Sequence, residues 1–219
     1  EAGTVGTAFP EMEIKLVDEE GNECPPGKMG VIHARGPQIM KGYYGDPEAT
    51  AKVLGADGWL NTGDLGVMTH DGALAIVGRI KDTIVLLDGE NIEPVPIEKH
   101  LAYSPYIDTA VVVGQDQKHL GALIVPDFNN LKEYAAENGI SYSDTETLLS
   151  NAEVRKLYRR EIDDEINRQK GFKSFEHIYD FTLLSKVFEV PRELSAKQEL
   201  KRNDVNKLYE REIRGIFEK

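Results

Sequence analysis

The stretch GWLNTGDLGVMTHDGALAIVGRIKDTIVLLDGENIEP, from Gly58 to Pro94, decides how this chain is organised. It holds two turn signals rich in Asp and Gly, then a short apolar strand that ends at Arg79. An Asp-Gly pair typical of a tight hairpin follows. The pattern predicts a β-rich region before residue 80, a linker near 79–82, and a second region after it.

Two side chains in this stretch suit the sugar of a nucleotide. Thr62-Gly63-Asp64 is predicted to be a turn after a short strand, and a carboxylate such as that of Asp64 can accept hydrogen bonds from both vicinal hydroxyls of a ribose. Arg79 supplies a planar fork of donors for ribose oxygens or phosphates. Taken alone, Asp64 is better explained as an exposed turn residue, and Arg79 is as well explained as an exposed strand end. The order and spacing of the whole stretch favour the nucleotide site.

The stretch resembles the nucleotide-binding region of the adenylate-forming enzymes, which include acyl-CoA synthetases, luciferases and peptide-synthetase adenylation domains. The upstream run GTVGTAFPEMEIKLVDEEGNECPPGKMGVIHARGPQIMKGYYGDPEAT is similar to the barrel-forming segment of that family, including its RGP…GYY signature. It departs at Val31, where a glutamate commonly follows the glycine. The run DTIVLLDGENIEPVPIE, Asp82 to Glu98, is most similar to the long-chain fatty-acyl-CoA synthetase branch.

The resemblance implies sites for ATP and CoA. Asp64 and Arg79 would bind the ribose of ATP, and Lys81 would be the hinge about which a mobile C-terminal domain swings. Gly89, in the Asp-Gly-Glu turn, would leave room for the pantetheine arm of CoA. Read from the residues alone, Lys81 is equally an exposed linker lysine and the turn an ordinary hairpin.

One position near the C-terminus departs from the family pattern. The family carries a run like Leu-Thr-Pro-Thr-x-Lys-Leu-Lys-Arg, whose first lysine reaches the α-phosphate and the acyl carboxylate during adenylation. Aligning on Leu200-Lys201-Arg202 puts Glu199 in that position, with Lys197 and Lys201 on either side. A charge ~4 Å from an anionic oxygen contributes about 4 kcal/mol at an effective dielectric near 20, and a glutamate reverses its sign. Either adenylation is impaired, or the loop is shifted and Lys197 reaches the phosphate.

The resemblance implies an ATP-dependent, AMP-forming long-chain fatty-acid–CoA ligase. The family's TSGTTG-like phosphate loop and the segment whose glutamate helps hold magnesium have no counterpart in the sequence. We expect both, and the acyl pocket, upstream of residue 1. Mg²⁺ is therefore expected in the intact enzyme with no ligand in this chain, and the chain alone is expected to be inactive. A ligase that loads acyl-carrier protein and a degenerate homologue that binds nucleotide without turnover are the alternatives.

The patterning predicts an α+β protein. Residues 1–80 show short strands and frequent turns, which predicts a small β-barrel-like piece, by resemblance the last part of a larger adenylation domain. Residues 81–219 predict a compact, mobile α+β C-terminal domain. Its expected paired strands lie at 109–113 and 120–125, after a helix at 94–103. Apolar residues at helical spacing predict two further helices with core faces: Val154, Leu157, Tyr158, Ile162 and Ile166, and Val205, Leu208, Tyr209, Ile213 and Ile216.

Composition limits the partners. The 219 residues carry a net charge of −12, which argues against nonspecific nucleic-acid binding. Residues 151–219 hold 16 basic and 14 acidic side chains, so they suit phosphate contacts best. The single cysteine, Cys24, excludes an internal disulfide and is typical of a reducing compartment. We expect a cytoplasmic protein whose partners are fatty acid, ATP and CoA, with peripheral membrane contact as an alternative.

Overall fold

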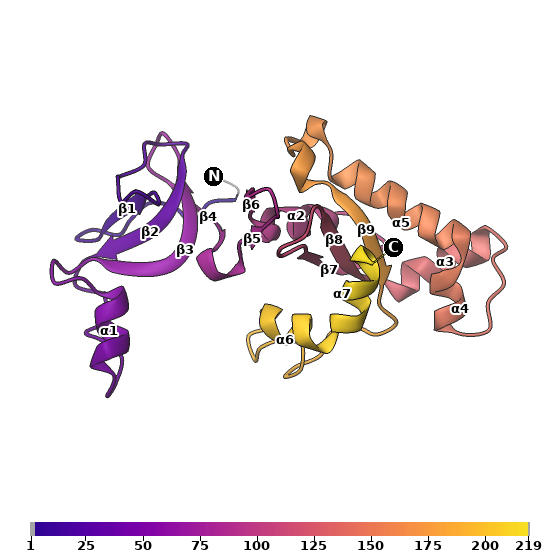
Figure 1. Cartoon of the computed structure of the whole chain (residues 1–219). Helices are drawn as coiled ribbons and strands as arrows, with labels where there is room; N and C mark the ends of the chain where they lie inside the picture. The colour runs from indigo at the N-terminus through magenta and orange to yellow at the C-terminus, as the bar shows by residue number, and fades with distance from the viewer. Residues whose placement is uncertain (1–2, 219) are drawn as a thin grey trace. The chain divides into compact units, whose positions relative to one another are not determined.

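The computed structural model describes residues 3–218, which form two compact units divided after Thr83 (Figure 1). The sequence placed the boundary after residue 80, inside the short 3-10 turn η1 (Ile80–Asp82) that closes the first unit. No helix among the described residues is long and apolar enough to cross a bilayer.

The first unit is an open antiparallel sheet in which each strand pairs with the next along the chain. Its strands are β1 (Glu13–Val17), β2 (Met29–Arg35), β3 (Leu60–Met68) and β4 (Leu74–Arg79). The expected barrel is not formed within residues 3–218. Closing a barrel requires the first and last strands to pair, and here the order β1-β2-β3-β4 leaves β1 and β4 as edges.

Helix α1 (Pro47–Val53) begins at residues that favour a helix start. The Asp46 side chain accepts a hydrogen bond from the Ala49 N–H at 2.8 Å, and Pro47 takes the first helical position, where its missing N–H costs nothing. The core of this unit is small: Leu16, Cys24, Ile32 and Leu74 are its buried members.

The second unit is built on a mixed sheet of three strands in the order β7-β8-β9. These are β7 (Ile107–Val113), β8 (Leu120–Pro126) and β9 (Ile178–Leu183), with β7 antiparallel and β9 parallel to β8. Every residue of β8 is buried, as expected for a central strand covered on both faces. The expected strand pair at 109–113 and 120–125 is therefore confirmed. A small hairpin, β5 (Ile84–Val85) and β6 (Asn91–Ile92), precedes the sheet in sequence.

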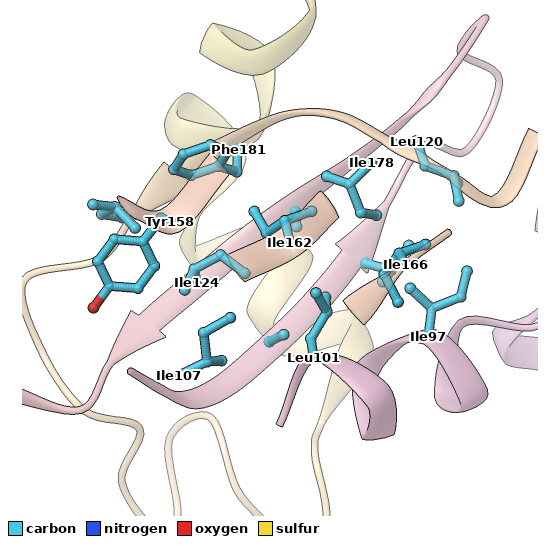
Figure 2. Packing of buried hydrophobic residues seen from close by; sticks show 14 of the residues in the cluster. Ile97, Leu101, Ile107, Leu120, Ile124, Tyr158, Ile162, Ile166, Ile178 and Phe181 are labelled. Atoms are coloured by element: carbon cyan, nitrogen blue, oxygen red, sulfur yellow. The ribbon is translucent and has the colours of Figure 1, made fainter. Parts of the chain in front are cut away.

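Helices cover both faces of this sheet. The remaining elements are α2 (Pro94–Leu101), α3 (Phe128–Glu137), α4 (Thr145–Ser150), α5 (Ala152–Glu165), η2 (Arg168–Lys170), η3 (Ser174–Glu176), α6 (Arg202–Leu208) and α7 (Glu210–Phe217). Figure 2 shows the larger core, where α2 and α5 pack on one face, with Tyr158 and Ile162 fully buried. On the other face α7 approaches β8 closely because Gly121 has no side chain: a Cβ there would lie 2.6 Å from Ile216 Cγ2.

The predicted stripe on α5 is confirmed, since all five of its apolar residues are buried. The prediction of a second apolar stripe, near the C-terminus, is only partly right. Its helix breaks at Tyr209, where φ is −113° and ψ is 25°, so α6 and α7 are separate helices. The break turns Leu208 outward, and this residue is 43% exposed rather than part of the core.

Candidate functional site

The structure brings the two predicted ribose ligands together. Asp64 on β3 and Arg79 on β4 are direct cross-strand partners, and Arg79 Nε lies 3.1 Å from Asp64 Oδ1. The side chains are 30% and 51% exposed. Surface ion pairs of this kind contribute only about 0–1 kcal/mol, so replacing the contact with hydrogen bonds to a ligand costs little.

The predicted turn at Asp64 is wrong, because residues 62–64 lie inside the strand β3. Gly63 interrupts that strand with φ at 73°, and its N–H donates to Asn61 Oδ1 at 2.9 Å. The Thr62 hydroxyl donates to the Ile32 carbonyl at 2.9 Å and accepts from the Asp64 N–H at 3.1 Å. A positive-φ glycine and side-chain-to-backbone hydrogen bonds, which are typical of turns, therefore occur inside this strand. The side-chain bonds of Asn61 and Thr62 hold the irregular backbone before Asp64.

Lys81 lies in η1, which follows β4 directly. Its side chain is exposed and η1 contains no buried residue, so no core packing holds this segment. The division between the two units falls after Thr83, two residues on. The use of Lys81 as a hinge stays a prediction.

Gly89 forms the predicted hairpin turn between β5 and β6. Its φ of 88° is a conformation that favours glycine, and its N–H donates to the Leu86 carbonyl at 2.9 Å. No atom within 4 Å would meet a Cβ placed there, so the backbone faces open space. A slender ligand can therefore pass close to this turn, although its contact with CoA stays a prediction.

The altered lysine position lies on a second tight hairpin, formed by residues 194–200 and called here the lysine hairpin. Leu194 and Leu200 form an antiparallel bridge at its base. The Gln198 N–H donates to the Ser195 carbonyl at 2.8 Å, and Gln198 has φ of 62°. This is a three-residue loop whose last residue is left-handed. Lys197 is exposed at the centre of the loop, whereas Glu199 follows the left-handed residue on the returning arm.

The three charged residues of this region have different environments. Lys201 Nζ forms an ion pair with the Asp204 carboxylate and donates to the Pro191 carbonyl at 3.1 Å. Within residues 3–218, Lys197 and Glu199 form no ion pair. Lys197 is therefore the lysine available to an incoming anion, and Lys201 is already bound within the fold.

Sequence reasoning missed the role of Arg202. Its Nη2 donates to both carboxylate oxygens of Glu98 at 2.8 Å, and its Nη1 donates to the Val112 carbonyl at 3.1 Å. Glu98 also accepts the Val112 N–H at 2.8 Å, so the pair ties α2, β7 and the start of α6 together. No local pattern could have revealed a contact between residues 104 apart in sequence.

Glu193 was also missed. Its side chain is 2% exposed, and it receives the Tyr209 hydroxyl at 3.0 Å and the Glu189 N–H at 3.0 Å. Burial acts to raise the pKa of Glu193, but these hydrogen bonds and the neighbouring Arg192 outweigh it, so the pKa is lowered. Burial and the hydrogen bond to Glu193 raise the pKa of Tyr209 to about 12.

The described residues contain no cluster of metal-ligating side chains. Among residues 3–218 no three or more His, Cys, Asp or Glu side chains are grouped so that they could hold a metal ion. The expectation of Mg²⁺ in the intact enzyme is unaffected, since its ligand was expected upstream.

Comparison with known proteins identifies the family. The family described as "AMP-binding enzyme C-terminal domain" matches residues 81–219, and the family "AMP-binding enzyme" matches residues 1–44. A probable acyl-activating enzyme 16 of Arabidopsis thaliana is 35% identical, over 98% of this chain and 31% of its own length. Human long-chain-fatty-acid–CoA ligase 1 is 33% identical, over 99% of the chain and 31% of its length. This chain thus spans about a third of these relatives.

A chloroplastic long-chain-fatty-acid–[acyl-carrier-protein] ligase of Arabidopsis thaliana is 46% identical, but over only 57% of this chain and 19% of its own length. Among solved structures, the adenylation domain of a carboxylate reductase from Mycobacterium chelonae matches with a TM-score of 0.80 at 22% identity. That match covers 99% of this chain and 34% of the other, and it supports the fold alone. The chain therefore belongs to the adenylate-forming, AMP-binding enzymes, as an acyl-activating ligase family member that includes their C-terminal domain.

Proposed function

We propose that the complete protein carrying this chain is an ATP-dependent, AMP-forming long-chain fatty-acid–CoA ligase. A carboxylate is a poor electrophile, so it is first joined to AMP as a mixed anhydride with release of pyrophosphate. The CoA thiol then attacks the acyl carbon and AMP leaves. The observation that carries the proposal is the cross-strand Asp64–Arg79 pair, a carboxylate and a guanidinium 3.1 Å apart at the end of the first unit.

Each residue has a distinct role in this proposal. Asp64 accepts hydrogen bonds from the ribose hydroxyls, and Arg79 donates to ribose or phosphate oxygens. Lys197 places its ammonium group against the α-phosphate and the acyl carboxylate, where fixed positive charge stabilises the transition state. Lys81 is the hinge between the two half-reactions, and Gly89 then lets the pantetheine arm of CoA pass. Magnesium would bind to residues outside this chain.

The lysine assignment is tested with alanine and charge-swap variants of the complete protein. Palmitate-dependent pyrophosphate exchange measures adenylation, and thioester formation from supplied palmitoyl-adenylate measures the second step. Lys197→Ala should abolish exchange and leave the second step nearly unchanged, while Glu199→Lys and Lys201→Ala should change exchange little. Lys207→Ala, an exposed lysine on α6, is the matched control.

The opposite pattern of activities would mean that Glu199 occupies the position of the family's adenylation lysine. In that case Glu199→Lys would accelerate exchange and Lys197→Ala would leave it unchanged. If every variant keeps both activities, the lysine hairpin has no role in the mechanism. The 219-residue chain by itself should show only background exchange, because the phosphate loop and acyl pocket are expected upstream.

An acyl-carrier-protein ligase is a second candidate, supported by the 46% identity of one such Arabidopsis enzyme over part of this chain. It shares the adenylation step and differs in the acceptor thiol. Thioester yield with CoA and with acyl-carrier protein, measured side by side, distinguishes the two. A homologue that binds nucleotide without turnover is the third, and it would show ATP binding with no exchange at all.

The cytoplasmic location stays a proposal of ours, with peripheral membrane contact as the alternative. Two similar Arabidopsis proteins are named as chloroplastic and peroxisomal. Fractionation of cells that express the complete protein tests it.

A further inference from the structure

A buried carboxylate lies at the base of the lysine hairpin, and the proposed chemistry does not use it. Glu193, 2% exposed, directly precedes the first hairpin residue. Its backbone belongs to the hairpin base, because the Lys201 N–H donates to the Glu193 carbonyl at 2.9 Å. The position of Glu193 therefore affects both arms of the lysine hairpin, one through the chain and the other through this hydrogen bond.

Donors from three sources converge on the Glu193 carboxylate. The Tyr209 hydroxyl donates to Oε1 at 3.0 Å, and Arg192 Nε lies 3.2 Å from the same oxygen. The Glu189 N–H donates to Oε2 at 3.0 Å. Burying a carboxylate is costly unless it is paired and hydrogen-bonded, and this site meets that requirement. The lowered pKa of Glu193 means that the group is ionised at neutral pH, so these bonds are charge-assisted.

The Tyr209 end of this network is fixed independently of the hairpin. Tyr209 occupies the junction of α6 and α7, and its ring lies 5.8 Å from that of Phe188. Helix α7 is in turn seated on the sheet through the close contact of Ile216 with Gly121. The hydroxyl of Tyr209 therefore links the hairpin base to the packed core of the second unit.

We propose that Glu193 and Tyr209 are positioning residues that hold the lysine hairpin in a single orientation and so determine where Lys197 presents its ammonium group. The structural half of this proposal, that both residues hold the hairpin, stands on the contacts above. The catalytic half, that this positions Lys197 for adenylation, rests on the proposed function of Lys197. The two halves are tested separately.

The structural half is tested on the 219-residue chain by limited trypsin digestion. Cleavage after Lys197 requires the hairpin to open, and cleavage after Lys118, in the exposed loop between β7 and β8, serves as the internal reference. Tyr209→Phe should raise the ratio of the first rate to the second by at least about tenfold, because loss of a charge-assisted hydrogen bond costs about 1.5–3 kcal/mol and each ~1.4 kcal/mol is a factor of ten. Glu193→Gln, which keeps the shape and removes the charge, should raise it as well.

The control is Tyr158→Phe. Tyr158 is fully buried and donates its hydroxyl to the Tyr106 carbonyl at 2.9 Å, so the variant also loses a buried tyrosine hydrogen bond, to a neutral acceptor, on the other face of the sheet. It should lower the melting temperature without changing the cleavage ratio. Unchanged ratios in both hairpin variants, or an equal rise in Tyr158→Phe, would overturn the proposal.

The catalytic half is tested in the complete protein with Tyr209→Phe. Pyrophosphate exchange should lose about tenfold in kcat with a smaller change in the KM for ATP, while thioester formation from supplied acyl-adenylate stays within twofold of the parent protein. Equal loss of both steps would indicate a merely structural role and contradict positioning. A loosened hairpin with normal exchange would instead contradict the role of Lys197 and leave the structural half intact.

Discussion

Gln198 adopts a backbone conformation that glycine occupies without strain. Its φ of 62° follows from the three-residue loop of the lysine hairpin, and a residue with a Cβ loses roughly 1–2 kcal/mol there. Gln198→Gly should therefore stabilise the second unit by about 1 kcal/mol, less than the full strain because glycine also gains freedom in the unfolded chain. Urea denaturation measures the change. Ala196→Gly, in the same loop at a position without positive φ, should destabilise by about 0.5–1 kcal/mol. Destabilisation by both would show that the loop tolerates glutamine without strain.

Asp64 and Arg79 offer a prediction that separates ligand binding from stability. In the complete protein, Asp64→Ala or Arg79→Ala should weaken ATP binding by roughly 1.5–3 kcal/mol for each charge-assisted hydrogen bond lost. Isothermal titration with ATP measures it. The matched control is Glu13→Ala, because Glu13 and Arg35 form a similar exposed cross-strand ion pair at 2.7 Å. Equal affinities for ATP in all three variants would mean that Asp64 and Arg79 do not bind the nucleotide.

At the scale of elements, the Glu98–Arg202 ion pair joins α2 to α6. The two side chains are only 14% and 10% exposed, so Arg202→Met removes the guanidinium paired with a nearly buried carboxylate. Loss of one member of a buried pair costs about 3–5 kcal/mol, and we expect a decrease of that size in the free energy of unfolding. The double variant Glu98→Gln with Arg202→Met removes the charge, keeps an acceptor for the Val112 N–H, and should recover most of it. No recovery would mean that the loss comes from packing rather than charge.

The contact between Tyr209 and Glu193 predicts a pH dependence at the junction of α6 and α7. Burial raises the pKa of Tyr209 to about 12 from 10.0, so the folded chain favours the neutral phenol. The unfolded chain loses this proton first. The stabilisation is therefore complete below pH ~10 and is lost as the pH rises towards about 12. Unfolding free energies at pH 8–12 should fall less steeply in Tyr209→Phe than in the parent chain. Parallel curves would contradict the assigned shift.

Local signals predicted the elements that depend on local contacts. The turn at Gly89 and the apolar stripe of α5 each follow from residues a few positions apart. Asp64 and Arg79 were predicted as one site from the order and spacing of a motif, although the backbone at Asp64 was predicted to be a turn and is part of a strand. The break at Tyr209 and the hydrogen bond from Tyr209 to Glu193 depend on packing between separate elements, and a single sequence carries no local trace of them.

At the scale of the whole molecule, Lys81 offers a test of domain movement. Lys81→Pro fixes φ near −65° and removes a backbone donor in the linker that no core packing holds. If the C-terminal domain swings there, pyrophosphate exchange should survive while thioester formation falls at least tenfold in the complete protein, by roughly 1.4 kcal/mol or more. Lys81→Ala, which keeps the backbone free, is the control. Equal loss of both steps would point to misfolding, and loss of neither would exclude a hinge at this residue.

The distance in sequence between Glu98 and Arg202 also has a consequence for biosynthesis. A chain emerges from the ribosome N-terminus first, so α2 and β7 are exposed well before residue 202 has been made. Until then the carboxylate of Glu98 has no guanidinium to meet, and burying it is unfavourable. The second unit can therefore complete its fold only after residue 202 has been made. A nascent chain stalled before Arg202 would lack the ion pair that joins α2 to α6.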